Sequence, residues 1–160
     1  MERWLARGAA VLLVLAVSFG VITAGGPAMA KEIVLFSAVD GRLVHADGSP
    51  ATGVRISRNW RRGSREAGDE ATTDGTGRFA FPEIAETPGF FASLLPGSEP
   101  TVQRMTAHAE SGDVLLWQAI KNSPERHAEL EGKPTKIVCR VDAEPGDGGL
   151  YWGTCVADQD

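Results

Sequence analysis

The chain has 160 residues, with 16 Lys and Arg against 21 Asp and Glu, and a formal net charge of −5 at pH 7. This acidic balance argues against a nucleic-acid partner, because phosphates are bound by a basic face. It also gives no reason to expect binding to an anionic membrane surface.

The first 30 residues predict a cleaved signal peptide. Arg3 and Arg7 precede an apolar run at residues 8–24, and Ala28-Met29-Ala30 has the small residues of a cleavage site. The alternative is a transmembrane anchor, but the run is shorter than the roughly 20 apolar residues of a span. We therefore expect cleavage after Ala30, a periplasmic or secreted protein, and no stable membrane insertion afterwards.

The mature chain, residues 31–160, predicts a single all-β domain. Without the signal peptide it keeps 14 basic and 20 acidic residues, for a net charge near −6. Short segments rich in β-branched and aromatic residues alternate with Gly, Pro, Asp and Asn, as in β-sandwiches. A chain of this length suits one modest core.

The first half of the domain predicts strands in close succession. Residues 31–45 predict one strand or a pair with a bulge around Asp40-Gly41, followed by a turn at 46–50 and a strand at 53–60. The polar stretch at 61–70 has no apolar period and is interpreted as a hairpin loop. Further strands are expected at 70–74 and 77–81.

The second half continues this pattern with longer connections. Residues 82–100 predict a connection that crosses between sheets, and a hairpin is expected at 101–120. Ser123-Pro124-Glu125 has the composition of a helix start. The last pair of strands falls at 136–141 and 150–155. We expect a single Greek-key β-sandwich of about seven to nine strands, with at most one short helix.

The two cysteines, Cys139 and Cys155, predict one disulfide. They flank the turn sequence EPGDGG, so a hairpin would bring them together, and an exported protein resides where disulfides form. The alternative is a free thiol pair in redox or metal chemistry. Their spacing is not C-x-x-C and no histidine lies near them, which disfavours that reading.

Residues 33–82 carry the most specific pattern of the chain. They contain GRLVHADGSPATGVRI from position 41 and TDGTGRFAFP from position 73. This resembles the carboxypeptidase regulatory-like domain of the transthyretin-type, prealbumin-like β-sandwiches, with its D-G-x-P-x-x-G-V-x-V and T-D-x-x-G-x-F motifs. The matching positions are Gly41, Asp47, Gly48, Pro50, Gly53, Val54, Ile56, Thr73, Asp74, Gly77 and Phe79.

The resemblance implies an accessory or binding module and supplies no catalytic residue. The second half, with its tryptophan-containing strand, E-L-x-G-K-P and paired cysteines, resembles small exported bacterial proteins on the same sandwich. Fold likeness alone does not establish function.

The stretch at 72–81, TTDGTGRFAF, predicts a structural turn. Asp74 is expected to accept hydrogen bonds from backbone N–H groups, and Gly77 to take a positive φ. Phe79 and Phe81 then enter the core. A single carboxylate does not make a calcium loop, and a phosphate loop would be followed by a helix.

No catalytic, metal-binding or cofactor-binding set is recognisable, so we expect no enzyme, metal or cofactor. His45, His108 and His127 lie in separate segments without an H-x-x-H spacing. There is no G-x-S-x-G motif, and Ser93, Ser98 and Ser111 fall in or beside predicted loops.

One cationic stretch stands out in the acidic chain. Arg58, Trp60, Arg61, Arg62 and Arg65 lie within eight residues, and Arg and Trp are frequent binding anchors. We take Trp60, Arg61, Arg62 and Arg65 as candidate partner-binding residues. The alternative is a solvated loop whose arginines pair with Glu66, Asp69 and Glu70.

These observations predict a non-enzymatic exported binding protein that acts on another protein, for example as an inhibitor or immunity-type factor. The alternative is a carbohydrate or cell-envelope polymer binding module, in which an exposed Trp60 or Trp152 stacks on sugar rings. An enzyme would need a cleft that draws His108 or His127 towards a carboxylate.

Overall fold

The computed structural model describes residues 32–89, 99–148 and 151–158. The predicted signal peptide at 1–30, Ser93 and Ser98 lie outside the described residues. No helix in the described part of the chain is long and apolar enough to cross a membrane.

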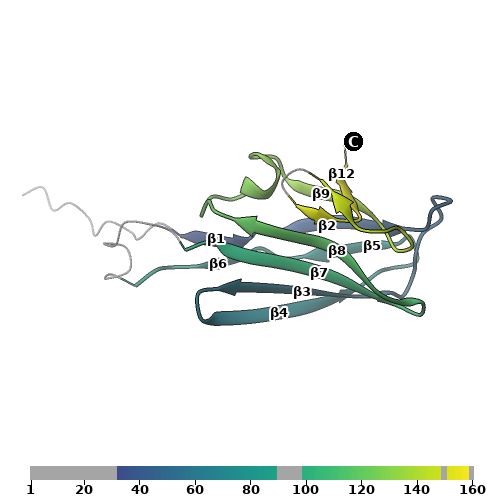
Figure 1. Ribbon diagram of the computed structural model, residues 1–160, viewed down its shortest axis with the longest axis horizontal. Helices are drawn as coiled ribbons and strands as arrows, with labels where there is room; N and C mark the ends of the chain where they lie inside the picture. Colours follow the sequence, from purple (N-terminus) through teal and green to yellow (C-terminus); the bar gives the residue numbers. More distant parts are fainter. Residues whose placement is uncertain (1–31, 90–98, 149–150, 159–160) are drawn as a thin grey trace, which may run out of the picture.

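The fold is an all-β sandwich, as predicted. Figure 1 shows most strands running along the long axis of the molecule. The larger sheet has six strands in the order β10 (Gly146–Asp147), β11 (Trp152–Gly153), β8 (Gly112–Lys121), β7 (Thr101–Ala109), β3 (Arg55–Arg62) and β4 (Arg65–Thr72). The smaller sheet has the order β12 (Cys155–Ala157), β9 (Thr135–Arg140), β2 (Val39–Val44) and β5 (Arg78–Phe81).

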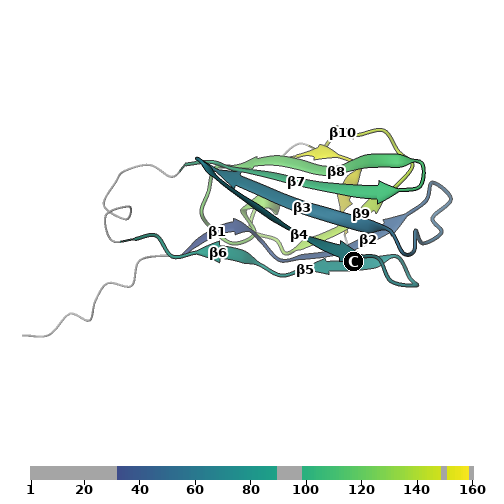
Figure 2. The ribbon, with the colours of Figure 1, turned by 90° about the horizontal axis from the view of Figure 1, so that it is seen from below.

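A third pair of strands forms a separate two-stranded sheet. β1 (Ile33–Phe36) pairs with β6 (Ile84–Glu86), just as β2 pairs with β5. Figure 2 shows β1 and β6 beyond β5, on the far side from β3, β7 and β8. The one helical element among the described residues is a 3-10 turn, η1 (Ala128–Leu130), a few residues after the predicted helix start.

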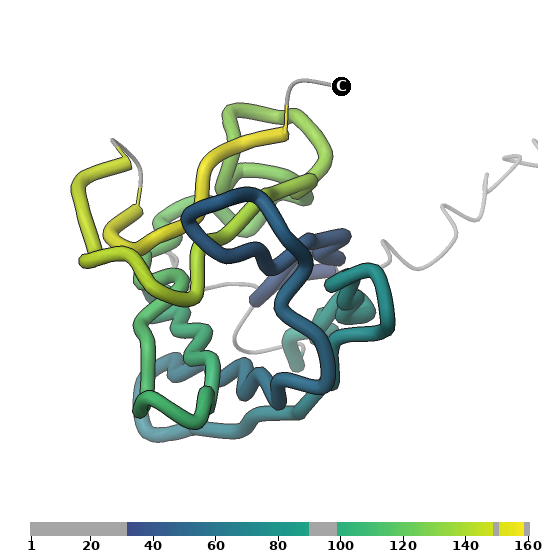
Figure 3. Tube along the Cα trace, turned by 90° about the vertical axis from the view of Figure 1, so that its right-hand side faces the viewer, coloured from purple at the N-terminus to yellow at the C-terminus, as the bar shows by residue number. Residues whose placement is uncertain are grey.

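The core lies between the sheets and comes from alternate strand residues. Figure 3 shows the chain surrounding this interior when viewed along the long axis. Apolar side chains that point inward from both sheets are buried almost completely. They include Phe36, Leu43, Ile56, Phe79, Phe81, Met105, Leu116, Trp117 and Ile137.

Three details differ from the prediction. The described residues contain twelve strands instead of seven to nine, because long strands are interrupted. The first interruption lies at Ser37-Ala38, between β1 and β2. Asp40-Gly41, where a bulge was expected, lies inside β2. The cause is that Ser37 gives its N–H to the carboxylate of Glu129 and not to a neighbouring strand.

The polar stretch at 61–70 was predicted as a hairpin loop, but most of it forms strands. β3 continues to Arg62, β4 begins at Arg65, and only two residues form the turn. β4 is the edge of its sheet and most of its side chains are exposed. Because few side chains of this edge strand are buried, its sequence does not need to alternate apolar and polar residues. The alternation by which a strand is recognised was therefore missing.

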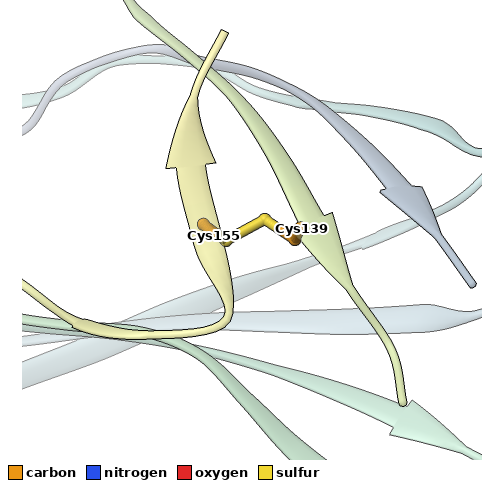
Figure 4. Close-up of a disulfide and its surroundings, with 2 residues drawn as sticks. All are labelled: Cys139 and Cys155. Atoms are coloured by element: carbon orange, nitrogen blue, oxygen red, sulfur yellow. A yellow bond between two sulfur atoms is a disulfide. The ribbon is translucent and has the colours of Figure 1, made fainter. Parts of the chain in front are cut away.

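The predicted disulfide joins the last two strands of the smaller sheet. Cys139 of β9 and Cys155 of β12 are direct cross-strand partners, and Figure 4 shows the bond spanning these strands. Both residues are buried. The disulfide therefore fastens the C-terminal edge strand to the sheet.

The turn at Asp74–Gly77 has the predicted geometry. Asp74 Oδ1 accepts hydrogen bonds from the N–H groups of Thr76 at 2.7 Å and Arg78 at 3.0 Å, and from the Thr76 hydroxyl at 2.7 Å. The bond from the Thr76 hydroxyl is the main cause that lowers the pKa of Asp74. Gly77 has a φ of +74°.

Replacing Gly77 by valine is expected to lower the free energy of unfolding by at least about 1 to 3 kcal/mol, from backbone strain alone. A Cβ at this position would also lie 2.5 Å from the carbonyl oxygen of Leu43. Urea unfolding measures the effect. Gly75→Val is the matched control, because a Cβ there meets no atom within 4 Å. Equal stability of the two variants would contradict the structural role of Gly77.

Candidate functional site

The first arginine of the cationic stretch, Arg58, lies inside the protein. Arg58 is 0% exposed, and its Nε and Nη2 donate to the two carboxylate oxygens of Asp69 at 2.9 and 2.6 Å. Its Nη1 donates to the carbonyl of Pro82 at 2.7 Å. The guanidinium carbon lies 5.0 Å from the ring centre of Phe36 and 4.6 Å from that of Phe81. Arg58 is thus a structural residue of the core.

The four candidate partner-binding residues divide between the interior and the surface. Arg62 is buried, with its Nε 3.6 Å from Glu86 Oε1, and Trp60 is partly buried against the core. Arg65 is exposed and donates to both oxygens of the same Glu86. Arg61 is exposed and has no ion pair among the described residues. Only Arg61 and Arg65 therefore remain accessible to a partner.

The broad surface of the six-stranded sheet is the best candidate for a functional site. Alternate residues of β3, β7 and β8 point away from the core, and cross-strand partners share one side of the sheet. We call this surface the outer face. It comprises Arg55, Ser57, Asn59, Arg61, Val102, Arg104, Thr106, His108, Asp113, Leu115, Gln118, Ile120 and Trp152.

A row of four exposed side chains crosses the middle of the outer face. Arg104 lies between Asn59 and Gln118, and Gln118 is the cross-strand partner of Trp152. Strands are spaced about 4.8 Å apart, so the row spans about 14 Å. Arg104 has no ion pair within the part of the chain that the structure describes. The row offers an indole, two amides and an exposed guanidinium to a ligand.

Large apolar side chains are exposed in this row and at the end of the face beyond it. Ile120 is 62% exposed and Trp152 is 48% exposed, which is unusual for residues of this size. The neighbouring residue in sequence, Tyr151, points the other way and stacks on Trp117 with 3.9 Å between ring centres. Burial raises the pKa of Tyr151. Tyr151 thus anchors the segment that presents Trp152.

A bulge in β8 determines where this segment docks. Met105 is paired with Trp117 and the next residue, Thr106, with Leu115, so Leu116 is the extra residue and both Leu116 and Trp117 are buried. Gly153 lies against the bulge, and a Cβ there would be 2.0 Å from the Leu116 carbonyl oxygen. Only glycine permits this approach.

A polar cluster occupies the other end of the outer face. His108 Nδ1 lies 2.7 Å from Asp113 Oδ1, and His108 Nε2 lies 3.0 Å from the hydroxyl of Ser57. A depression of about 420 Å³ surrounds them and is also lined by Asn59, Arg104, Thr106 and Leu115. The structure therefore brings His108 to a carboxylate. The other two histidines do not join this cluster.

A second polar cluster is buried beneath η1. Glu129 is 5% exposed and accepts four hydrogen bonds, from the N–H and hydroxyl of Ser37 at 2.9 and 2.7 Å, Gln103 Nε2 at 2.8 Å and Lys121 Nζ at 3.1 Å. Burial raises the pKa of Glu129, but these donors outweigh it and hold the pKa below its usual range. Because the cluster is buried and its carboxylate is fully bonded, we assign it to folding.

The described residues contain no group of three or more His, Cys, Asp or Glu that could hold a metal ion. Asp74 and Gly77, the loop that most resembles an active site in sequence, form only a turn.

The fold and its exposed face define a small all-β sandwich protein. The chain belongs to the family described as Domain of unknown function (DUF6795), whose model matches residues 39–144. Neither a curated protein nor a solved structure matches the chain. The resemblance to the carboxypeptidase regulatory-like domain stays a prediction. Trp152 and Cys155 lie beyond the matched residues.

Sequence reasoning missed the outer face for identifiable reasons. In the chain, Ser57 is far from both His108 and Asp113. A hairpin turn separates His108 from Asp113, so only strand pairing brings the three side chains together. The alternation along β3 places Ser57 and Asn59 on the side opposite Ile56, as in any strand. An exposed Trp152 was an assumption of the carbohydrate alternative. The sequence did not show on which side of the sheet the indole lies, because that depends on the bulge at Leu116.

Proposed function

We propose that this protein is an exported binding protein, periplasmic in a bacterium with an outer membrane, that contacts another protein through the outer face. It would act by covering a surface of that protein, as an inhibitor or immunity-type factor does. The observation that carries the proposal is the exposure of Trp152 and Ile120 near Arg104, which forms no ion pair with any described residue. Such a role requires no reaction at this face.

The composition of the outer face supports protein binding. Trp and Arg dominate the energetics of many protein interfaces, and an exposed apolar patch rimmed by polar groups marks interaction sites. Arg104, in the middle of the row, suits a carboxylate of the partner, which it can bind with two hydrogen bonds. Ile120 and Val102 extend the apolar area next to Arg61.

Export is supported by the predicted signal peptide and by the disulfide between Cys139 and Cys155. Disulfides persist in oxidising compartments and are rare in the cytosol. A disulfide-fastened sandwich with a rigid sheet face loses little conformational entropy on binding, which favours affinity.

Trp152→Ala and Arg104→Ala are each expected to weaken partner capture at least tenfold, because each truncates an anchor worth about 1.4 kcal/mol or more. The full gene is expressed, and the exported product is immobilised and exposed to a cell-envelope extract of the source bacterium. Retained proteins are quantified by mass spectrometry, and the affinity of the main one is then measured with purified components.

Val156→Ala and Arg42→Ala are the matched controls. Val156 is 62% exposed and Arg42 is exposed, but both belong to the smaller sheet. They should retain the partner at the level of the unmodified protein. Arg62→Ala is avoided because Arg62 is buried beside Glu86. Capture that survives in Trp152→Ala and Arg104→Ala, or is lost equally in the controls, would contradict the proposal.

A saccharide ligand is the second candidate, and the exposed indole of Trp152 favours it. Trp60 is partly buried, so Trp152 is the better stacking platform of the two. This alternative expects sedimentation with peptidoglycan or polysaccharide that Trp152→Ala abolishes and Val156→Ala does not. Absence of the protein from such pellets would exclude it.

A further inference from the structure

The cluster of Ser57, His108 and Asp113 has the hydrogen-bond connectivity of a serine hydrolase triad. In such a triad a carboxylate orients the histidine through Nδ1, and Nε2 faces the serine hydroxyl. Here the Oδ1–Nδ1 distance is 2.7 Å and the Nε2–Oγ distance is 3.0 Å, both within the range for proton transfer.

The three side chains come from three adjacent strand positions. Ser57 lies on β3, His108 on β7 and Asp113 on β8, where His108 and Asp113 are direct cross-strand partners. Ser57 faces Thr106, two residues before His108 on the same side of the sheet. The sheet ladder holds all three backbones, so the geometry does not depend on a loop.

The surrounding depression contains the other groups that acyl transfer requires. Asn59 and Arg104 line it beside Ser57 and carry N–H donors that could stabilise an oxyanion. Leu115 supplies an apolar wall for an acyl group. The His108 side chain is 25% exposed, so the site is open to a ligand.

We infer that Ser57 is a nucleophile activated by His108 and Asp113, and that the site accepts short acyl esters. This goes beyond the proposed binding function. Ser57 Oγ attacks the ester carbonyl carbon while its proton passes to His108 Nε2. The bond to the leaving alcohol breaks as His108 returns that proton to the alcohol oxygen. Water then attacks the acyl-serine in the same way, releasing the carboxylic acid and restoring Ser57.

Shape and chemistry limit the substrate. The depression, at about 420 Å³, is open and shallow, so it can hold a short acyl group but not enclose a long chain. Arg104 lies in its wall and is free of an ion pair among the described residues, which favours an ester with a nearby anionic group.

A fluorophosphonate probe, which phosphonylates activated serines, tests the inference on the exported product of the full gene. We expect a single adduct, mapped to Ser57 by peptide mass spectrometry. Ser57→Ala and His108→Ala should abolish it, and Asp113→Asn should slow it roughly tenfold or more, because the histidine loses its orienting anion. The rates of p-nitrophenyl acetate hydrolysis should rank the variants in the same order as the labelling rates.

Ser111→Ala is the control, because Ser111 is an exposed turn serine close to Asp113. It should label like the unmodified protein. Circular dichroism and thermal melting establish that each variant is folded. Absence of the adduct in folded protein, or an adduct that persists in Ser57→Ala, would overturn the inference. Labelling needs no partner and capture needs no reaction, so failure of one proposal is distinguishable from failure of the other.

Discussion

Replacing Glu129 by alanine is expected to lower the free energy of unfolding by about 3 to 5 kcal/mol, the usual cost of breaking a buried ion pair. The carboxylate accepts from Lys121, whose side chain is 2% exposed, and its removal would leave that cation without its counter-charge. Gln103 and Ser37 would lose their acceptor as well. Urea unfolding monitored by tryptophan fluorescence measures the loss.

The position of this cluster explains the size of the effect. Gln103 also donates to the carbonyl of Leu35, at 2.8 Å, and accepts from Trp117 Nε1 at 3.4 Å. The carboxylate therefore connects β1, β7, β8 and η1. Its loss should loosen the segment around η1 as well as the core, which hydrogen exchange would detect.

Glu66→Ala is the matched control, because Glu66 is an exposed carboxylate on the edge strand β4 and should change stability by less than about 0.5 kcal/mol. The double variant Glu129→Ala/Lys121→Met should recover part of the loss, because no buried charge remains unpaired. Equal stability of Glu129→Ala and Glu66→Ala would contradict this account.

The same carboxylate makes stability depend on pH. The pKa of Glu129 is lower in the folded protein than its ordinary value of 4.5, so the unfolded chain binds more protons between the two values. Its contribution is complete above pH 4.5 and is lost as the pH falls through the folded pKa. The melting temperature should therefore fall more steeply on acidification in the unmodified protein than in Glu129→Gln.

Removing the disulfide with Cys139→Ala/Cys155→Ala is expected to cost about 2 to 5 kcal/mol. The cysteines are 16 positions apart, a loop for which the chain-entropy account gives about 3 kcal/mol. Alanine is preferred to serine because both sites are buried and a hydroxyl would lack a partner. The shift of the urea midpoint measures the loss.

Reduction of the unmodified protein with dithiothreitol serves as the comparison and should give a similar shift. Trp152 lies three residues before Cys155, so the disulfide also secures the segment that presents the indole. The double variant should therefore lose partner capture at urea concentrations above its own, lower unfolding midpoint. An unchanged urea midpoint in both experiments would show that strand pairing alone holds β12 to β9.

Much of the architecture was predictable from local patterns. Alternation identified β3 and β5, and a turn between two apolar segments identified β7 and β8. The turn residues Asp74 and Gly77 marked the corner between sheets. The cysteine count and spacing predicted the disulfide. These features depend on side-chain periodicity, turn stereochemistry and short loop closure, all of which act between residues near in sequence. The hairpin expected across EPGDGG was wrong, because Gly146–Asp147 and Trp152–Gly153 pair in the larger sheet and the strand paired with β9 begins only at Cys155.

The buried charged residues were not predicted, because a charged side chain can be buried when it pairs with partners that are distant in sequence. Arg58 and Glu129 are charged, and sequence alone assigns such residues to solvent. In the fold Arg58 finds Asp69 and two aromatic rings, while Glu129 finds four donors from three other residues. Partners at such separations are known only once the strands are paired.

The sequence by itself therefore determined the all-β class, most strands, the corner at Asp74 and the disulfide. Only the tertiary structure decided which charges are buried, that Arg62 faces inward, and that Trp152, Arg104 and His108 share one face. The physical reason is that alternation specifies two sides of a strand. Which side meets water, and which residues lie beside one another, follows from strand order and register.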